Sequence, residues 1–218
     1  MRKFFHENGL AISAFALFFL FWGAMAIVGF FNYNQQQQEH EQALISFWTY
    51  LTTGHFWEAT FENWESEFLQ MGLFVLLTAF LFQKGSAESK TEEEHAQEQK
   101  EEDQGEQVPR PVRMGGWIKK LYENSLSITL LTLFILCFIF HAVEGVREYN
   151  QQQALLRQPP VSVWQFLVAS EFWFQSFQNW QSEFLAVGSM IVLTIFLRQK
   201  GSAESKRVGA PTSETGGK

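Results

Sequence analysis

The sequence predicts an all-α membrane protein with four transmembrane helices, arranged as two parallel two-helix repeats with aromatic outer interfacial helices. Three observations predict this fold class. Long apolar blocks alternate with polar blocks, although the mean hydropathy of the 218 residues is only -0.10. About 41 of the first 90 residues recur 116 positions later without a gap. Lys and Arg are concentrated in alternate connecting segments, as expected of a chain that crosses a bilayer several times.

The internal repeat defines the domain organisation. "NWESEFL" at 63–69 returns as "NWQSEFL" at 179–185, and "QKGSAESK" at 83–90 returns unchanged at 199–206. A recurrence of this kind indicates duplication of one structural unit. We therefore expect a first two-span repeat at 1–90, an acidic flexible cytoplasmic linker at 91–118, a second two-span repeat at 119–206 and a disordered tail at 207–218.

Each repeat contains two apolar segments. The first segments, 10–31 and 126–146, are long enough for a membrane span of about 20 residues. The second segments, 68–82 and 184–197, are shorter and need the aromatic residues before them to cross the bilayer. No cleavage pattern follows 10–31, so we expect an uncleaved anchor rather than a signal peptide.

The basic residues predict the orientation. The loop 32–66 contains no Lys or Arg, and the loop 147–183 contains only Arg147 and Arg157. The positive-inside rule then places both termini and the linker in the cytoplasm of a multi-pass protein. Because each repeat has an even number of spans, the repeats should be parallel and related by an axis along the membrane normal. The cytoplasmic basic residues are Arg2, Lys3, Lys84, Lys90, Lys119, Lys120, Arg198, Lys200, Lys206 and Arg207.

The polar segments and the single cysteine exclude several function classes. The stretch 90–107 has almost no apolar residues, so it cannot bury enough surface to become ordered. Basic residues do not cluster on an aromatic face, so we expect no nucleic-acid partner. Cys137 lies in an apolar run and is expected to be a packing residue, because one cysteine forms no intrachain disulfide and no Cys/His spacing suggests a metal site.

A polar site is predicted at the start of the second span of each repeat. Trp57, Phe61, Trp64 and Phe68 form one helical stripe, so the helix should begin before its apolar core. The candidate polar site lies on another face of this helix and its copy. Its carboxylates are either solvated at the interface or face each other across the repeat axis, where a charge near membrane depth is costly unless paired or wet. Its residues are Asn63, Ser66, Glu67, Asn179, Ser182 and Glu183.

The repeated "QKGSAESK" is a candidate cytoplasmic motif. Its glycines suit a helix C-terminus and its lysines suit the cytoplasmic end. A phosphate-binding loop is the competing interpretation, but one glycine beside an acidic residue is a poor phosphate cradle. The motif residues that we single out are Gly85, Ser86, Glu88, Lys90, Gly201, Ser202, Glu204 and Lys206.

Two further segments have features of functional elements. Residues 46–60 follow the layout of a pore loop, but "VASEF" in the second copy lacks the glycines of a potassium filter. We keep only a re-entrant or interfacial element there. His141 and Glu144 share a helix face, but their counterparts Met25 and Val28 are apolar, and Arg147 is placed to neutralise Glu144.

The string "NWxSEFL", an apolar run and "QKGSAESK" together resemble a family of uncharacterised bacterial membrane proteins, classed as a domain of unknown function. The resemblance covers both repeats. It implies location in the bacterial inner membrane and brings no known activity.

The function expected from the sequence is that of a non-enzymatic membrane protein acting through helix packing or partner contacts. The alternative is a small channel or transporter whose site is formed by the repeated Asn, Ser and Glu residues. The expected partners are the lipid bilayer and a homo-oligomeric or membrane-protein partner. No nucleophile, metal set or cofactor signature is present in the sequence, so we expect no cofactor and no enzyme.

Overall fold

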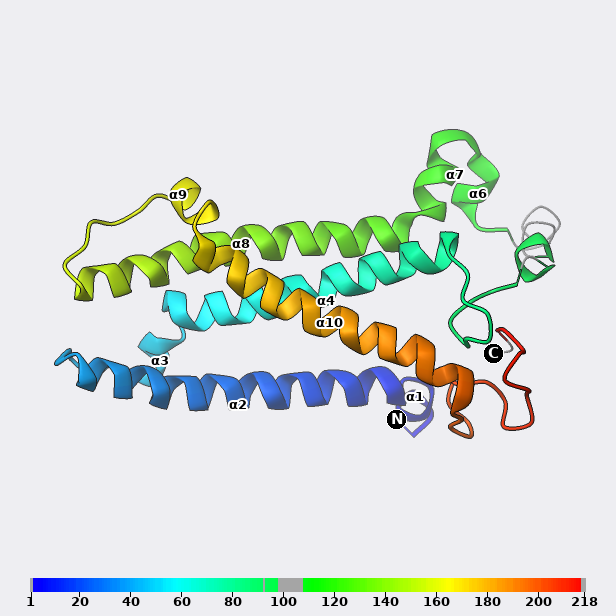
Figure 1. Ribbon diagram of the computed structural model, residues 1–218, viewed down its shortest axis with the longest axis horizontal. Helices are drawn as coiled ribbons and strands as arrows, with labels where there is room; N and C mark the ends of the chain where they lie inside the picture. Colours follow the sequence, from blue (N-terminus) through cyan, green and yellow to red (C-terminus); the bar gives the residue numbers. More distant parts are fainter. Residues whose placement is uncertain (1, 92, 98–107, 217–218) are drawn as a thin grey trace. The chain divides into compact units, whose positions relative to one another are not determined.

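The computed structural model describes residues 2–91, 93–97 and 108–216, and this part of the chain is helical with no strand. The all-α prediction is confirmed at this level. Figure 1 shows the helices, coloured in sequence order from blue at the N-terminus to red at the C-terminus. They are α1 (Arg2–Glu7), α2 (Gly9–Glu39), α3 (Phe47–Tyr50), α4 (Gly54–Phe80), α6 (Arg110–Met114), α7 (Gly116–Glu123), α8 (Ser125–Leu155), α9 (Val163–Leu167) and α10 (Ser170–Phe196).

Two of the helices, α2 and α8, are long and apolar enough to cross a membrane. They contain the predicted spans 10–31 and 126–146. The predicted spans 68–82 and 184–197 lie mostly in α4 and α10, which are continuous helices of 27 residues each. These two helices begin three residues before Trp57 and Trp173, so each starts before its apolar core, as the aromatic stripe predicts.

Helices α2 and α8 run further than their apolar segments. Both continue through the repeated "YNQQQ", because Tyr, Asn and Gln do not break a helix and Gln is a good helix former. The chain turns just beyond them, where Glu41 and Arg157 adopt left-handed backbone conformations with φ of 55° and 56°.

The chain forms two compact units that do not follow the repeat boundaries. Unit 1 comprises Met1–Phe61 and Ile139–Phe172, and unit 2 comprises Glu62–Phe138 and Trp173–Lys218. Helices α4, α8 and α10 each contribute one segment to each unit. Each unit therefore contains segments from both sequence repeats.

In unit 1, the segments before α3 and α9 are held by the same type of contact. The Asn34 side chain bonds both the amide (2.9 Å) and the carbonyl (3.1 Å) of Ile45. Asn150 bonds both groups of Val161 in the same way, at 2.7 and 2.9 Å. Since Asn34 and Asn150 lie 116 residues apart, the repeated "YNQQQ" has a local structural role in both copies. It anchors the segment that returns from the long helix.

The short helices α3 and α9 each place an aromatic ring against a glycine of a long helix. A Cβ atom on Gly29 would overlap the Tyr50 hydroxyl, and one on Gly145 would lie 2.7 Å from Cε1 of Phe166. Tyr50 and Phe166 are both buried. These glycines are needed for close approach of the rings, not for an unusual backbone angle.

In unit 2, the α8 segment contacts the α4 and α10 segments through aromatic and aliphatic side chains. A Cβ atom on Gly72 in α4 would lie 3.0 Å from Cδ2 of Leu131 in α8. The Phe134 ring of α8 lies edge-on to the Trp180 ring of α10, with centroids 6.0 Å apart. Small residues that allow helices to approach closely are typical of helix pairs in membranes.

Parts of the predicted linker and tail form helices or hydrogen-bonded segments. Part of the linker prediction falls on residues 92 and 98–107, which lie outside the described residues. Residues 93–97 are helical, and α6 and the start of α7 occupy 110–118. The described part of the tail folds back in unit 2, where the Gly216 amide donates to the Ser86 carbonyl and the Gly85 amide donates to the Thr215 hydroxyl.

Candidate functional site

The most buried carboxylate of unit 2 is Glu65, on the polar side of α4. Its side chain is fully buried. Its Oε1 atom accepts hydrogen bonds from the Ser176 hydroxyl (2.8 Å) and the Trp180 indole N–H (3.2 Å), both on α10. A buried carboxylate needs such donors, because burial without them would cost several kcal/mol.

A second carboxylate extends this contact. Glu62 lies one turn before Glu65 on α4, and its Oε1 atom accepts a hydrogen bond of 2.6 Å from the Asn179 side chain on α10. The α4–α10 polar cluster therefore consists of Glu62, Glu65, Ser176, Asn179 and Trp180. Its hydrogen bonds link two helices that are more than 100 residues apart in sequence.

The structure brings together part of the predicted polar site. Glu67 and Glu183 lie close enough for the charge of one to act on the other. Asn179 belongs to the α4–α10 polar cluster, whereas Asn63 is exposed. The hydroxyls of Ser66 and Ser182 bond within their own helices, where each donates to the carbonyl three residues earlier, of Asn63 or Asn179, at 2.8 Å.

Reasoning from the repeat missed Glu62 and Glu65. Their counterparts in the second copy are Gln178 and Gln181, so neither carboxylate is duplicated. A signal was nevertheless present in the sequence, because Glu58, Glu62 and Glu65 recur at spacings of four and three along an aromatic helix. Acidic residues on one stripe of such a helix indicate polar partners on a neighbouring element.

The α4–α10 polar cluster can accept hydrogen bonds, bind protons and align two helices. It contains no thiol or imidazole nucleophile. Among the described residues, no three His, Cys, Asp or Glu side chains are arranged to hold a metal ion.

The two "QKGSAESK" copies form the same hydrogen-bonded turn. The Gln83 amide donates to the Ser89 hydroxyl at 3.0 Å, and the Gln199 amide donates to the Ser205 hydroxyl at 2.9 Å. In each copy the first serine hydroxyl, Ser86 or Ser202, accepts from the glutamate amide two residues later at 3.1 Å. Gly85 and Gly201 both have φ of +84°, a conformation that favours glycine. The serines and glycines of the motif are therefore explained by the turn that follows α4 or α10.

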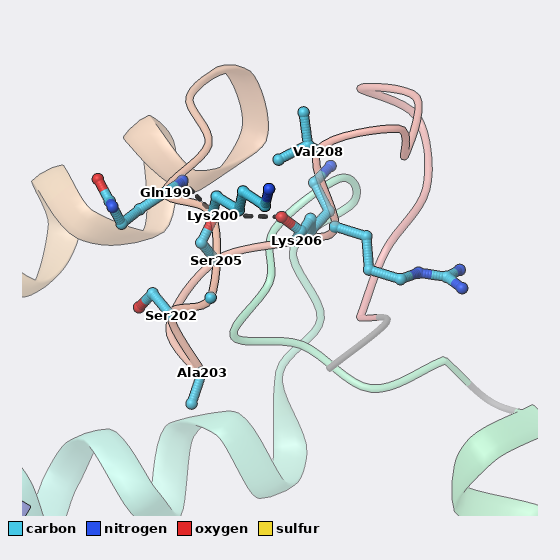
Figure 2. Close-up of a pocket in the computed structure, with 9 residues that line it drawn as sticks. Gln199, Lys200, Ser202, Ala203, Ser205, Lys206 and Val208 are labelled. Carbon is cyan, nitrogen blue, oxygen red and sulfur yellow. Dashed lines mark hydrogen bonds between the residues drawn. The ribbon is translucent and has the colours of Figure 1, made fainter.

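The second turn borders a cavity of about 590 Å³, lined in part by Lys200, Ser202 and Lys206 (Figure 2). Figure 2 shows the Ser205 hydroxyl bonded between the Gln199 amide and the Lys206 carbonyl. This arrangement fixes the backbone around the cavity.

Lys206 itself is buried, and its ammonium group is directed at the tail. Nζ donates to the carbonyls of Pro211 (3.4 Å), Thr212 (3.2 Å) and Glu214 (2.8 Å). Burial lowers the pKa of Lys206, the Arg198 guanidinium lowers it further, and Glu214 opposes these effects. Because a lysine has three N–H donors, these three bonds occupy the ammonium group and leave it poorly suited to a phosphate.

His141 and Glu144 have separate environments in unit 1. His141 is fully buried, and its ring lies 4.8 Å from the Phe172 ring. Glu144 pairs with Arg147, one turn along α8. The two residues do not form a metal site in the part of the chain that the structure describes.

Fold and site together define an all-helical protein with two apolar helices of membrane-spanning length and a buried polar cluster between helices. The chain belongs to the family described as Domain of unknown function (DUF6766), whose model matches residues 1–217. No curated protein and no solved structure matches the chain.

Proposed function

We propose that this protein is an integral membrane protein of the bacterial inner membrane that acts through helix packing and partner contacts and is not an enzyme. The observation that carries the membrane assignment is the exposure of α2. Only 6% of its most apolar stretch is buried, and the rings of Phe15, Phe19 and Phe21 are all exposed. A contiguous apolar surface of this kind is unfavourable in water and suited to lipid.

The apolar segments 68–82 and 184–197, which lie mostly in α4 and α10, are proposed as the remaining two spans. Phe80 and Phe196, at their C-terminal ends, are exposed, as lipid-facing residues would be. With α2 and α8 they make a four-span protein whose termini and linker are cytoplasmic. The distribution of Lys and Arg supports this orientation.

A role in packing and partner contacts is supported by two features. The α4–α10 polar cluster uses its polar groups in hydrogen bonds between its own helices, which suits alignment better than reaction chemistry. Trp48 on α3 and Trp164 on α9 occupy equivalent repeat positions and are 77% and 79% exposed. Such indole rings are suited to the bilayer interface or to the surface of a second membrane protein.

Membrane extraction tests the assignment. The full chain, expressed in a bacterium, should stay in the membrane pellet after alkaline carbonate washing and should float with lipid in a density gradient. Deleting residues 10–31 should reduce membrane insertion. Deleting residues 98–107 serves as the control and should not reduce it. Recovery of the unaltered chain in the carbonate supernatant would contradict the proposal.

A small channel or transporter is the second candidate, and the proximity of Glu67 and Glu183 favours it. Two neighbouring carboxylates on helices of membrane length are suited to binding a proton or a cation. Flux measured in reconstituted vesicles tests this candidate. Glu67→Gln and Glu183→Gln should each abolish the flux without changing assembly, and Glu7→Gln, in the exposed first helix, should have no effect.

A further inference from the structure

Unit 1 contains a polar cavity of about 610 Å³ where the C-terminal ends of α2 and α8 meet α3. Its wall includes Tyr33, Gln36, Thr49, Thr53, Glu148 and Gln152. All of these residues belong to unit 1. The volume lies within the range typical of pockets for small organic molecules, roughly 300–1,000 Å³. The cavity is separate from the α4–α10 polar cluster, whose residues all belong to unit 2.

Glu148 gives this cavity a buried negative charge. Its side chain is only 5% exposed. Oε1 accepts a hydrogen bond of 3.2 Å from Gln152, whereas Oε2 is buried and makes no hydrogen bond within the described part of the chain. An ionised carboxylate that is buried and incompletely bonded is unfavourable, and a bound cation would offset that cost.

The described lining of the cavity contains no ammonium or guanidinium group to balance Glu148, since no Lys or Arg lies in it. Its one imidazole is that of His40, and the Glu148 carboxylate also acts on His55. Arg147, the adjacent residue, is directed elsewhere and pairs with Glu144 and the Thr52 carbonyl. Burial, the Glu148 carboxylate and Tyr33 raise the pKa of the nearby Tyr50 to about 12, so this phenol stays neutral. Cations are therefore favoured in the cavity and anions are disfavoured.

The lining chemistry suits an organic cation better than a metal ion. Calcium and magnesium prefer several oxygen ligands, usually more than one carboxylate, and Glu148 is the one carboxylate among the described lining residues. Glutamine carbonyls and threonine hydroxyls can accept hydrogen bonds from N–H groups. Tyr33 also lines the cavity, and aromatic rings attract ammonium groups.

We propose that this cavity binds a small organic ammonium ion, with Glu148 supplying the charge and Tyr33 and the glutamine side chains supplying the remaining contacts. The inference goes beyond the proposed packing role and does not depend on it. Glu148 corresponds to Asn32 in the first copy, so the repeat provides one such site per chain.

Titration calorimetry on the full chain in detergent tests the proposal. The probes are 1,4-diaminobutane, choline and calcium chloride, with sodium chloride holding the ionic strength constant. We expect saturable binding of at least one of the two ammonium probes and none of calcium. The preference between them distinguishes a primary ammonium ligand from a quaternary one. Glu148→Gln should weaken binding at least tenfold, because it removes the buried charge. Glu144→Gln, one turn away and outside the lining, should stay within about twofold of the unaltered chain.

A second variant keeps the test decisive if Glu148→Gln does not fold. Gln36→Trp should fill part of the cavity and abolish binding, while near-ultraviolet circular dichroism confirms that the chain remains folded. Three results would overturn the proposal. These are calcium binding in preference to both ammonium probes, no binding of either ammonium probe to the unaltered chain, and equal affinity in the unaltered chain and a folded Glu148→Gln or Gln36→Trp variant.

Discussion

At the scale of single residues, the position of a carboxylate on α4 decides what it does. Glu65 and Glu67 are two residues apart, so they lie on different faces of the helix. Glu65 is fully buried and bonded to Ser176 and Trp180, whereas Glu67 is exposed and interacts with the charge of Glu183. The structural contribution is therefore expected from Glu65 and any proton or cation binding from Glu67.

Glu65→Ala should destabilise the protein. The change leaves the buried Ser176 hydroxyl and the half-buried Trp180 indole N–H without their acceptor, and a buried unsatisfied donor costs about 1–3 kcal/mol. Thermal unfolding in detergent should show a clearly lower Tm. Glu65→Gln should retain most of the stability, because its amide oxygen can accept the same bonds. Glu67→Ala is the matched control, and a loss of Tm as large as that of Glu65→Ala would contradict this assignment.

The stability of unit 1 should depend on pH through His55. Burial lowers the pKa of His55 below its usual value of 6.5, and the Glu148 carboxylate opposes this shift. Below pH 6.5 the unfolded chain therefore binds a proton more readily than the folded chain does. Folding stability should be fully present above about pH 6.5 and should decrease as the pH falls below it.

Tm measured between pH 8 and pH 5 checks this expectation. The Tm of the unaltered protein should fall on the acid side, and His55→Gln should reduce the dependence. His40→Gln, an exposed histidine at the end of α2, serves as the control. An identical pH profile for the protein and His55→Gln would exclude His55 as the source.

The sequence predicted some of these residues and missed others for a physical reason. Repetition identifies what both copies require, and it drew attention to Asn63, Ser66, Glu67 and their counterparts. The α4–α10 polar cluster is asymmetric, with glutamates on one helix and donors on the other. A search for duplicated residues therefore included Asn179 but passed over Glu62 and Glu65.

At the scale of elements, the long helices depend on close contacts with the short ones. Tyr50 of α3 and Phe166 of α9 lie against Gly29 and Gly145. An added methyl group at either glycine meets a buried ring that has little room to move. This contact recurs at equivalent repeat positions.

Gly145→Ala should destabilise unit 1 by about 1–3 kcal/mol, the usual cost of overpacking a buried contact. Its Cβ would lie 2.7 Å from Phe166 and 3.2 Å from the Glu58 carboxylate. Gly188→Ala is the control, because a Cβ there meets nothing within 4 Å and alanine favours a helix. Chemical unfolding followed by tryptophan fluorescence compares the two, and equal stability would show that the Phe166 ring moves aside at no cost.

Apolar length and aromatic periodicity were enough to predict that the four long elements are helices and that α4 and α10 begin early. The ends of α2 and α8 were not predicted. The length of an apolar segment predicts only the part of a helix that a bilayer would cover. The helix itself continues until the backbone turns, here at Glu41 and Arg157. The turn in "QKGSAESK" was predicted from its glycine, but the hydrogen bonds of Ser89 and Ser205 depend on how the backbone folds back over six residues.

At the scale of the whole molecule, the two similar halves of the sequence do not form two independent domains. Each compact unit takes segments from both repeats, so neither repeat alone contains a complete unit. A chain truncated after residue 90 should therefore lack the α8 and α10 segments of both units. Sequence similarity detects the copying of a segment, but it does not show which copies pack together.

The proposed topology gives the last prediction. After Cys137→Ala removes the native thiol, a single cysteine is introduced at Ser202 in the turn after α10 or at Gln42 in the loop after α2. In intact cells, a membrane-impermeant maleimide should label the Gln42→Cys variant and not the Ser202→Cys variant, because the positive-inside rule places the first outside and the second in the cytoplasm. Permeabilised cells control for accessibility, since both positions should then react. Labelling of Ser202→Cys in intact cells would exclude a cytoplasmic C-terminus, and protection of both positions would place the α2–α3 loop on the cytoplasmic side.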